Sequence, residues 1–370
     1  MSNKPIGTPR FYVDFSQLAR VKGMWSTDFD SHSRTSNLNS PSSWLSGNAA
    51  PEAWLGDYTT PKTYYSNDST GFVEFIFTFY YESGDFSSLN DDWSKLMEKM
   101  DYVAVVNHNL LQAFPNDSIE ITARRGGSSS DGTLNHPNAI EGDNIISNHN
   151  GFYLGSLSST FWSHSDTIDL DAYRRNIAIR LTGNNMTNIE FKIGSMMFGT
   201  IINMPFAPNL GVKKSVVYDG LDIKRGVSGS DIVHIENQGL PNFTQGSPWK
   251  NYDYSLRHGN SISLGEGGRR RWDLKFSYIS ENTLFTNNNH DRPSGSGYDN
   301  GGSWISYSAE GEIERLYNYT LGGALPFLFC PDPEQTNPEY AMCRFTSDGF
   351  KATQNAHNVW DISMGIEEIW

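Results

Sequence analysis

The sequence predicts a mainly β protein, and three features of its composition and patterning support that class. Aromatic residues make up 13% of the 370 residues and charged residues only 19%, a balance that favours short strands over salt-bridged helices. The chain also contains 34 glycines and 16 prolines, which end strands and form turns. Short strand-like segments recur along the chain, whereas helical periodicity is rare. The length of 370 residues favours two domains.

The first 70 residues combine one predicted strand with a long polar stretch. Residues 11–15 (FYVDF) have the apolar, β-favouring composition of a short strand. Residues 27–68 are dominated by Ser, Asn, Asp, Gly and Pro, and we expect them to form a loop. Disordered linkers are poor in aromatic residues, so this loop is predicted to be ordered. Its aromatic residues are Trp44, Trp54, Tyr58, Tyr64 and Tyr65.

Residues 71–204 are predicted to form a β-sandwich or jelly roll. The clearest strand pattern is at residues 72–81 (FVEFIFTFYY), which mix aromatic and β-branched side chains. Residues 91–100 have helical apolar spacing and are predicted to cap the sandwich. Series of short strands at such spacing are typical of sandwiches. The remaining predicted strands lie at residues 101–106, 118–123, 152–161, 176–181 and 189–198.

The central segment at residues 189–205 (IEFKIGSMMFGTIINMP) reads as two short strands. Gly194 and Gly199 interrupt its apolar runs, at positions where a bulge or a tight bend forms most easily. Pro205 and Pro208 follow and mark the expected entry into a second domain. We expect the two flanks of this segment to move as rigid bodies about residues 204–209.

Residues 205–370 predict a second β domain with a looser pattern. Residues 271–279 (RWDLKFSYI) alternate apolar and polar side chains, as a strand buried on one face does. A short helix is predicted at residues 312–319, and polar loops are predicted at residues 287–302 and 331–340. The other predicted strands lie at residues 209–218, 221–227, 231–235, 325–330 and 359–370.

The net charge and the cysteine content limit which binding partners and which cellular compartment the sequence predicts. The net charge of −14 argues against nucleic acid as a partner, because binding to it depends on neutralising phosphates. Cys330 and Cys343 are the only cysteines and have no metal-binding spacing, so free thiols are expected. The first fifteen residues contain no apolar leader, and no apolar run reaches 18 residues. We therefore expect folding in a cytoplasm without membrane insertion.

Residues with catalytic or metal-binding potential are few. Ser163, His164 and Asp166 are too close in sequence to form a triad, whose members come from separate elements. Asp166, Asp169 and Asp171 could hold Ca²⁺, but a solvated strand edge is the favoured interpretation.

Glu74 stands among aromatic residues, where burial would suit a glycosidase general acid. No second carboxylate can be assigned opposite it, and an outward-facing glutamate is favoured. We predict no catalytic residue, no cofactor and no metal.

Two further groups of residues are candidates for binding. Tyr153 and Trp162 could stack on sugar rings, or they could fill the core of the sandwich. Arg269, Arg270 and Arg271 lead into an alternating strand, so only every second one of them shares a face. Their guanidinium groups suit salt bridges to acidic neighbours in an assembly, and salt bridges within the chain remain the alternative.

Three stretches resemble minor tail proteins of long-tailed bacteriophages. NNMTNIEFKIGSMMFGTIINMP is similar to the passage where such proteins leave one β-domain for the next. GGRRRWDLKFSYIS is similar to their basic and aromatic strand after a glycine turn. LPFLFCPDPEQTNPEYAMCRF, followed by VWDISMGIEEIW, is similar to their closing pattern of a buried strand, a proline-bearing loop and a terminal strand.

The resemblance implies a distal tail protein located in the virion and assembled in the host cytoplasm. In that family a galectin-like or jelly-roll sandwich is attached to a tube-forming, barrel-like β domain that oligomerises around the tail axis. Here the sandwich (71–204) is expected to be inserted between the two parts of the tube-forming domain (1–70 and 205–370). The implied partners are other copies in a ring, together with tail tube, hub and fibre proteins. A carbohydrate-binding receptor protein and a virion-bound polysaccharide-degrading enzyme are the alternatives.

Overall fold

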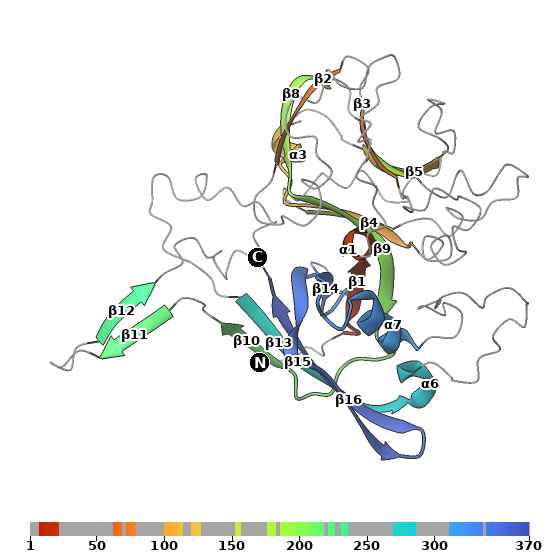
Figure 1. Ribbon diagram of the computed structural model, residues 1–370, viewed down its shortest axis with the longest axis vertical. Helices are drawn as coiled ribbons and strands as arrows, with labels where there is room; N and C mark the ends of the chain where they lie inside the picture. Colours follow the sequence, from red (N-terminus) through yellow and green to blue (C-terminus); the bar gives the residue numbers. More distant parts are fainter. Residues whose placement is uncertain are drawn as a thin grey trace, which may run out of the picture.

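The computed structural model describes residues 7–21, 62–68, 72–78, 100–113, 120–126, 152–156, 176–182, 186–217, 221–225, 231–235, 269–285, 311–335 and 338–369. These residues are mainly β, which confirms the predicted class (Figure 1). Every pair of neighbouring strands in the described sheets is antiparallel.

Helices are short in the described part of the chain, and strands alternate with turns along its length. The helices are α1 (Phe15–Val21), α3 (Leu110–Ala113), α6 (Glu281–Leu284) and α7 (Glu312–Tyr319). The strands are β1 (Arg10–Asp14), β2 (Lys62–Asp68), β3 (Phe72–Thr78), β4 (Tyr102–Val106), β5 (Glu120–Gly126), β6 (Phe152–Ser156), β7 (Asn176–Thr182), β8 (Met186–Ile193), β9 (Ser195–Asn203), β10 (Lys213–Val217), β11 (Leu221–Arg225), β12 (Asp231–Ile235), β13 (Arg269–Ser280), β14 (Phe327–Cys330), β15 (Ala341–Ala356) and β16 (Val359–Glu368).

One nine-stranded sheet holds the described core together, in the order β10-β13-β16-β15-β14-β1-β9-β4-β6. The N-terminal strand β1 lies between β14 and β9, so it joins the C-terminal strands to those of the middle of the chain. Strands β1, β14 and β4 are almost wholly buried and apolar, as strands covered on both faces are. The sheet therefore combines strands from all three predicted ranges.

The expected rigid-body movement about residues 204–209 is wrong. Strand β9 precedes this segment and β10 follows it, yet both belong to the same nine-stranded sheet. Two halves of one hydrogen-bonded sheet cannot move independently without breaking the ladder between them. Residues 204–209 connect two strands of one sheet and do not form a hinge.

The two glycines in the central segment, Gly194 and Gly199, have different structural roles. Gly194 bends the chain between β8 and β9, and its N–H donates to the carbonyls of Val106 and Asn107 at 3.1 and 3.0 Å. The bend sends β8 to pair with β2 while β9 enters the large sheet, as predicted for this position. Gly199 does not interrupt β9; a Cβ there would lie 1.9 Å from the carbonyl oxygen of Val13, so close backbone approach requires glycine.

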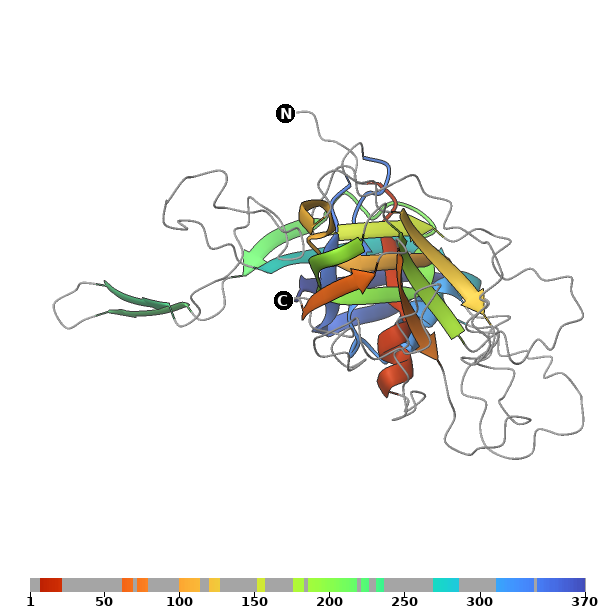
Figure 2. The same cartoon turned by 90° about the horizontal axis from the view of Figure 1, so that it is seen from above.

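Three smaller sheets accompany the large one. Strands β2 and β8 form a pair, and β3, β7 and β5 form a three-stranded sheet. Both belong to the region between residues 62 and 193 and lie together at one end of the molecule (Figure 1). Strands β11 and β12 form a separate hairpin that projects away from the large sheet in both views (Figure 2).

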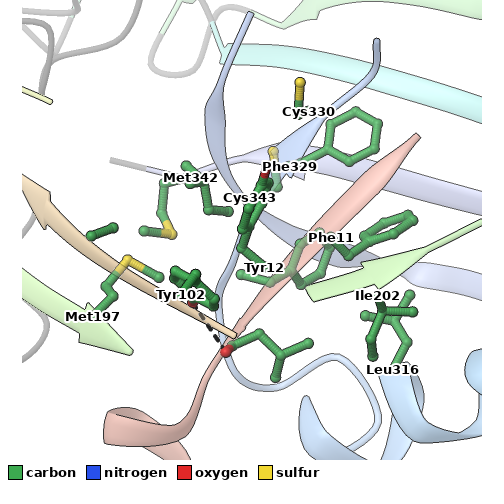
Figure 3. Close-up of a cluster of buried hydrophobic side chains, with 14 of the residues drawn as sticks. Phe11, Tyr12, Tyr102, Met197, Ile202, Leu316, Phe329, Cys330, Met342 and Cys343 are labelled. Atoms are coloured by element: carbon green, nitrogen blue, oxygen red, sulfur yellow. Dashed lines mark hydrogen bonds between the residues drawn. The ribbon is translucent and has the colours of Figure 1, made fainter. Parts of the chain in front are cut away.

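Aromatic side chains pack with methionine, cysteine and aliphatic side chains in the core beside β1 (Figure 3). Phe11 contacts Phe327 and Phe329, with ring centroids 5.5 and 5.2 Å apart. Tyr102 packs edge-on against the ring of Tyr12, and its hydroxyl donates to the carbonyl of Val13 at 3.0 Å. The buried hydroxyl is thus satisfied without leaving the apolar core.

Several elements differ from the sequence-based prediction. The strand predicted at residues 11–15 ends at Asp14, where α1 begins, and β2 occupies the end of the stretch predicted as a loop (27–68). The long strand β15 was not predicted at all. Helix α7 matches its prediction, and its residues Ile313, Leu316 and Tyr319 are buried. The helix predicted at residues 91–100 and the loop at 287–302 lie outside the described residues, apart from Met100.

The two thiols are free, as predicted, and both are buried. Burial raises the pKa of Cys330 to about 12 and also raises that of Cys343. Both thiols therefore stay protonated near neutral pH, where a protonated thiol is a poor nucleophile and metal ligand.

Candidate assembly site

The predicted arginine triplet opens β13, next to the short edge strand β10. Arg270 lies opposite Val216, and Arg271 lies opposite Ser215. Because side chains alternate along a strand, Arg270 and Arg271 point to opposite faces of the sheet. Arg270 is only 4% exposed, whereas Arg271 is partly exposed. The triplet therefore divides into an inward and an outward part, as its alternation predicts.

Arg270 forms a two-pronged salt bridge with Glu368 of β16. Its Nε donates to Glu368 Oε2 at 2.7 Å, its second terminal nitrogen donates to Oε1, and its backbone N–H also reaches Oε2 at 3.0 Å. Burial by itself lowers the pKa of Arg270, but the hydrogen bonds and charge of Glu368 outweigh burial and raise it above its ordinary value. Both members of a buried pair with this geometry are ionised, and each charge is compensated by its partner.

Glu339 and Lys214 extend this salt bridge toward solvent. Arg270 also donates to Glu339, whose carboxylate accepts from Lys214 Nζ at 2.9 Å. Burial raises the pKa of Glu339, but the charges of Arg270 and Lys214 bring it below its ordinary value. Both cations lie over the ring of Trp272, at 5.5 and 5.7 Å from its centroid. We call Arg270, Glu368, Glu339 and Lys214 the Arg270 cluster; it connects β10, β13, β16 and the chain before β15.

The outward face of β13, β16 and β15 is charged. Arg271 lies opposite Glu367, which in turn lies opposite Arg344 on the other side of β16. Arg271 Nε also lies 3.4 Å from Asp273 Oδ1, and both side chains are partly exposed. We call this surface the outward wing face. Arg270 thus matches the intramolecular alternative, while Arg271 keeps the surface position that an interface role needs.

A buried carboxyl group, missed from the sequence, lies in the centre of the large sheet, at the end of β1. Asp14 ends β1 and accepts hydrogen bonds at Oδ1 from the N–H of Ser16, at 2.8 Å, and from its hydroxyl. It therefore acts as the N-cap of α1. Burial raises the pKa of Asp14 to about 7, with hydrogen bonds from Ser16 acting in the opposite direction. The sequence signal that could have revealed it is an Asp directly after an apolar strand.

The other predicted site residues do not come together in the described structure. Tyr153 is 2% exposed in β6, and a ring buried to this degree offers no face to a sugar, which counts against glycan stacking by it. Glu74 lies in β3, where its backbone is opposite Arg180 of β7. Trp162 and the group comprising Ser163, His164, Asp166, Asp169 and Asp171 lie outside the described residues.

Among the described residues, no cluster of three or more His, Cys, Asp and Glu side chains could hold a metal ion. No helix in the same part of the chain has the length and apolar content needed to cross a membrane. No protein-family model, curated protein or solved structure matches the chain.

Proposed function

We propose that this chain is a structural protein of a bacteriophage tail, located at or near the distal tail tip. Copies of it form a ring that connects the tail tube to hub or fibre proteins. The ring is held by repeated head-to-tail contacts, which close when the rotation between neighbours divides a full turn.

One observation carries the proposal: each of the three stretches that resemble minor tail proteins contributes at least one strand to the nine-stranded sheet, although β8 of the first stretch pairs with β2 instead. The first stretch contains β8 and β9, the second contains β13, and the third contains β14, the start of β15, and β16. In the sheet these strands follow one another as β13-β16-β15-β14, then β1, then β9. Segments far apart in sequence thus build one continuous unit, which is what a shared family core would require.

The proposal includes an inserted sandwich. The sheet β3-β7-β5 and strand β8 lie within residues 71–204 and would form part of a galectin-like or jelly-roll domain. Strand β2, which pairs with β8, comes from residues 62–68, before the predicted start of that domain. Strands β4, β6 and β9, which also lie within residues 71–204, extend the large sheet instead. An insertion attached in this way would share part of its sheet with the tube-forming domain.

The test is to find the chain in purified virions. We expect peptides of this protein in the virion by mass spectrometry, and an antibody raised against it should label the distal tail end in immunogold micrographs. A capsid protein antibody serves as the control for access and background. Labelling confined to the capsid, or absent from intact virions that label for the capsid protein, would contradict the proposal.

A further inference from the structure

Helix α1 follows β1 directly, and two apolar side chains near its start hold it against the large sheet. Phe15 and Leu18 are buried, and the ring of Phe15 packs edge-on against that of Tyr319 in α7, with centroids 5.5 Å apart. At the far end of α1, Val21 is 58% exposed. Figure 2 shows α1, in red, at the margin of the packed strands. Among the described side chains, the docking of α1 therefore depends on a few apolar contacts near β1.

Two buried polar groups beside these contacts have no hydrogen-bond partner within the described part of the chain. Asp14 Oδ1 accepts both hydrogen bonds from Ser16, in the first turn of α1, whereas Oδ2 has no partner. The side-chain nitrogen of Gln17, also in this turn, is buried and unpaired. A buried group that loses its hydrogen bonds to water costs free energy, and an ionised group costs far more than a neutral one. Detachment of α1 would return both groups to water.

The strand side of Asp14 cannot open as easily as α1. Strand β1 is hydrogen-bonded along both edges, to β14 and to β9. Gly199 lies opposite Asp14, where β9 approaches the carbonyl of Val13 so closely that no Cβ fits. Opening there breaks the ladder of the large sheet, whereas α1 is a seven-residue helix with little stability of its own. We therefore expect α1 to move first.

No other buried carboxyl group lies on the described elements around Asp14. The remaining carboxyl groups there are Asp101, just before β4, and Glu312 and Glu314, in the first turn of α7. Asp101 and Glu312 are exposed, and Glu314 is partly exposed. A carboxylate that already faces water changes its surroundings little when α1 detaches, so these three groups should add little pH dependence to the detachment.

The other titratable groups around Asp14 ordinarily change charge only above about pH 8. From α7 these are Tyr317, Tyr319 and Arg315, whose guanidinium group lies 5.7 Å from the centroid of the Tyr319 ring. From the sheet they are Arg10 and Tyr12 of β1, Tyr102 of β4 and Cys330 of β14, and from α1 Arg20. Strand β9 contributes none. Among these groups, Asp14 alone is both buried and able to change charge near neutral pH.

From these contacts we infer that the protonation state of Asp14 controls the docking of α1, which stays on β9 and α7 while the carboxyl group is protonated and detaches as it ionises. Detachment gives water access to Asp14 Oδ2 and to the side-chain amide of Gln17. It also exposes Phe15 and Leu18, whose burial opposes it. The change takes place within one copy of the chain, whether or not copies form a ring.

The surroundings of Asp14 set this change near neutral pH. Burial raises the pKa of Asp14 to about 7 while α1 is docked, and the hydrogen bonds from Ser16 act in the opposite direction. Once α1 has detached, the carboxyl group is in water and its pKa returns toward the ordinary value of 3.8. Between these two pH values the detached form binds fewer protons, so a rise in pH favours detachment. Above pH 7 the carboxyl group is ionised in both forms, and no further change follows.

Hydrogen exchange of the full chain, followed by mass spectrometry from about pH 5 to pH 9, tests this inference. Peptides from α1 are compared with peptides from the buried strand β4, after correction for the pH dependence of chemical exchange. We expect the open fraction of α1 to rise about tenfold per pH unit up to pH 7 and to level off above it. At every pH, α1 should be less protected than β4, because it opens without the sheet.

Two matched variants assign the effect to one carboxyl group. Asp14→Asn keeps the helix cap, because its amide oxygen still accepts from Ser16, and it should abolish the rise. Asp101→Asn removes the exposed carboxylate that accepts from the hydroxyl of Thr200 at 2.9 Å, and it should leave the rise unchanged. A rise that persists in Asp14→Asn would overturn the inference. In the unmodified chain, an open fraction of α1 that stays constant up to pH 7, or an α1 that exchanges only together with β4, would overturn it as well.

Discussion

The centre of the large sheet and its C-terminal side use their strands in different ways. In the centre, β14, β1 and β4 are buried on both faces, so almost every side chain is apolar. On the C-terminal side, β13 and β16 bury every second side chain and leave a charged face outward. Packing in the centre therefore specifies the fold, whereas side chains on the outward face of the C-terminal side can change at little cost to the free energy of unfolding.

Removing an aromatic side chain from the centre should have the largest effect. Phe11→Ala removes a fully buried ring that contacts Phe327 and Phe329, and we expect a loss of about 4 kcal/mol in the free energy of unfolding. Thr353→Ala on the exposed part of β15 should change stability by less than about 0.5 kcal/mol. Urea denaturation measures both, and equal losses would remove the distinction between the two regions.

The buried carboxyl group of Asp14, in the centre of the sheet, should make the free energy of unfolding depend on pH. Asp14 has a pKa of about 7 in the fold against an ordinary value of 3.8, so the folded state holds a proton that the unfolded state releases between these values. Well below pH 3.8 the carboxyl group is protonated in both states. As pH rises from 4 to 7, stability should fall by about 1 kcal/mol per pH unit on account of this group, and above pH 7 no further loss follows.

The variant Asp14→Asn isolates that contribution. An asparagine oxygen still accepts from Ser16, so the N-cap is kept while the charge is removed. The difference in unfolding free energy between the variant and the unmodified chain should grow from pH 4 to pH 7 and favour the variant. A difference that stays constant over this range would show that Asp14 is ionised in the fold.

On the C-terminal side, the buried charge of Arg270 is paired with Glu368, whereas the hydrogen bonds that Asp14 accepts in the centre come from the uncharged Ser16. Arg270→Ala leaves Glu368 buried without its cation, and we expect a loss of about 3 kcal/mol. Arg271→Ala, one residue further along the same strand, removes a partly exposed side chain and should cost less than about 1 kcal/mol. Thermal or urea unfolding distinguishes them, and similar losses for the two variants would contradict the inward and outward assignment.

A smaller effect is expected where two central strands touch. Gly199→Ala places a methyl group 1.9 Å from the carbonyl oxygen of Val13, so β1 and β9 must separate, at a cost of about 2 kcal/mol. Gly211→Ala is the matched control, because a Cβ at that position meets nothing within 4 Å. Unchanged unfolding of Gly199→Ala would mean that β1 and β9 are not in direct register.

The sequence predicts local periodicity well and long-range pairing poorly. The alternation of β13 and the helical spacing of α7 were readable because each pattern is complete within a few residues. Strand β15 was missed because the sequence Ser347-Asp348-Gly349 and the polar residues after Lys351 interrupt its apolar pattern. Its register shift between Phe345 and Phe350 is the structural counterpart of that interruption.

The candidate site shows the same limit. Alternation alone shows that neighbouring arginines point to opposite faces, but it does not identify which face is the core. Glu368 lies 98 positions after Arg270, and only the order of strands in the sheet brings them together. The backbone conformation of Tyr278, with a φ of +64°, was also not predictable, because RWDLKFSYI continues its alternation through the register shift between Phe276 and Ile279.

The most direct test of the account is a cryo-EM reconstruction of the distal tail end of intact virions. We expect a ring of copies of this chain at the distal end of the tail, in contact with the tail tube on one side and with hub or fibre proteins on the other. A reconstruction in which the chain is absent from the tail would contradict the proposed function.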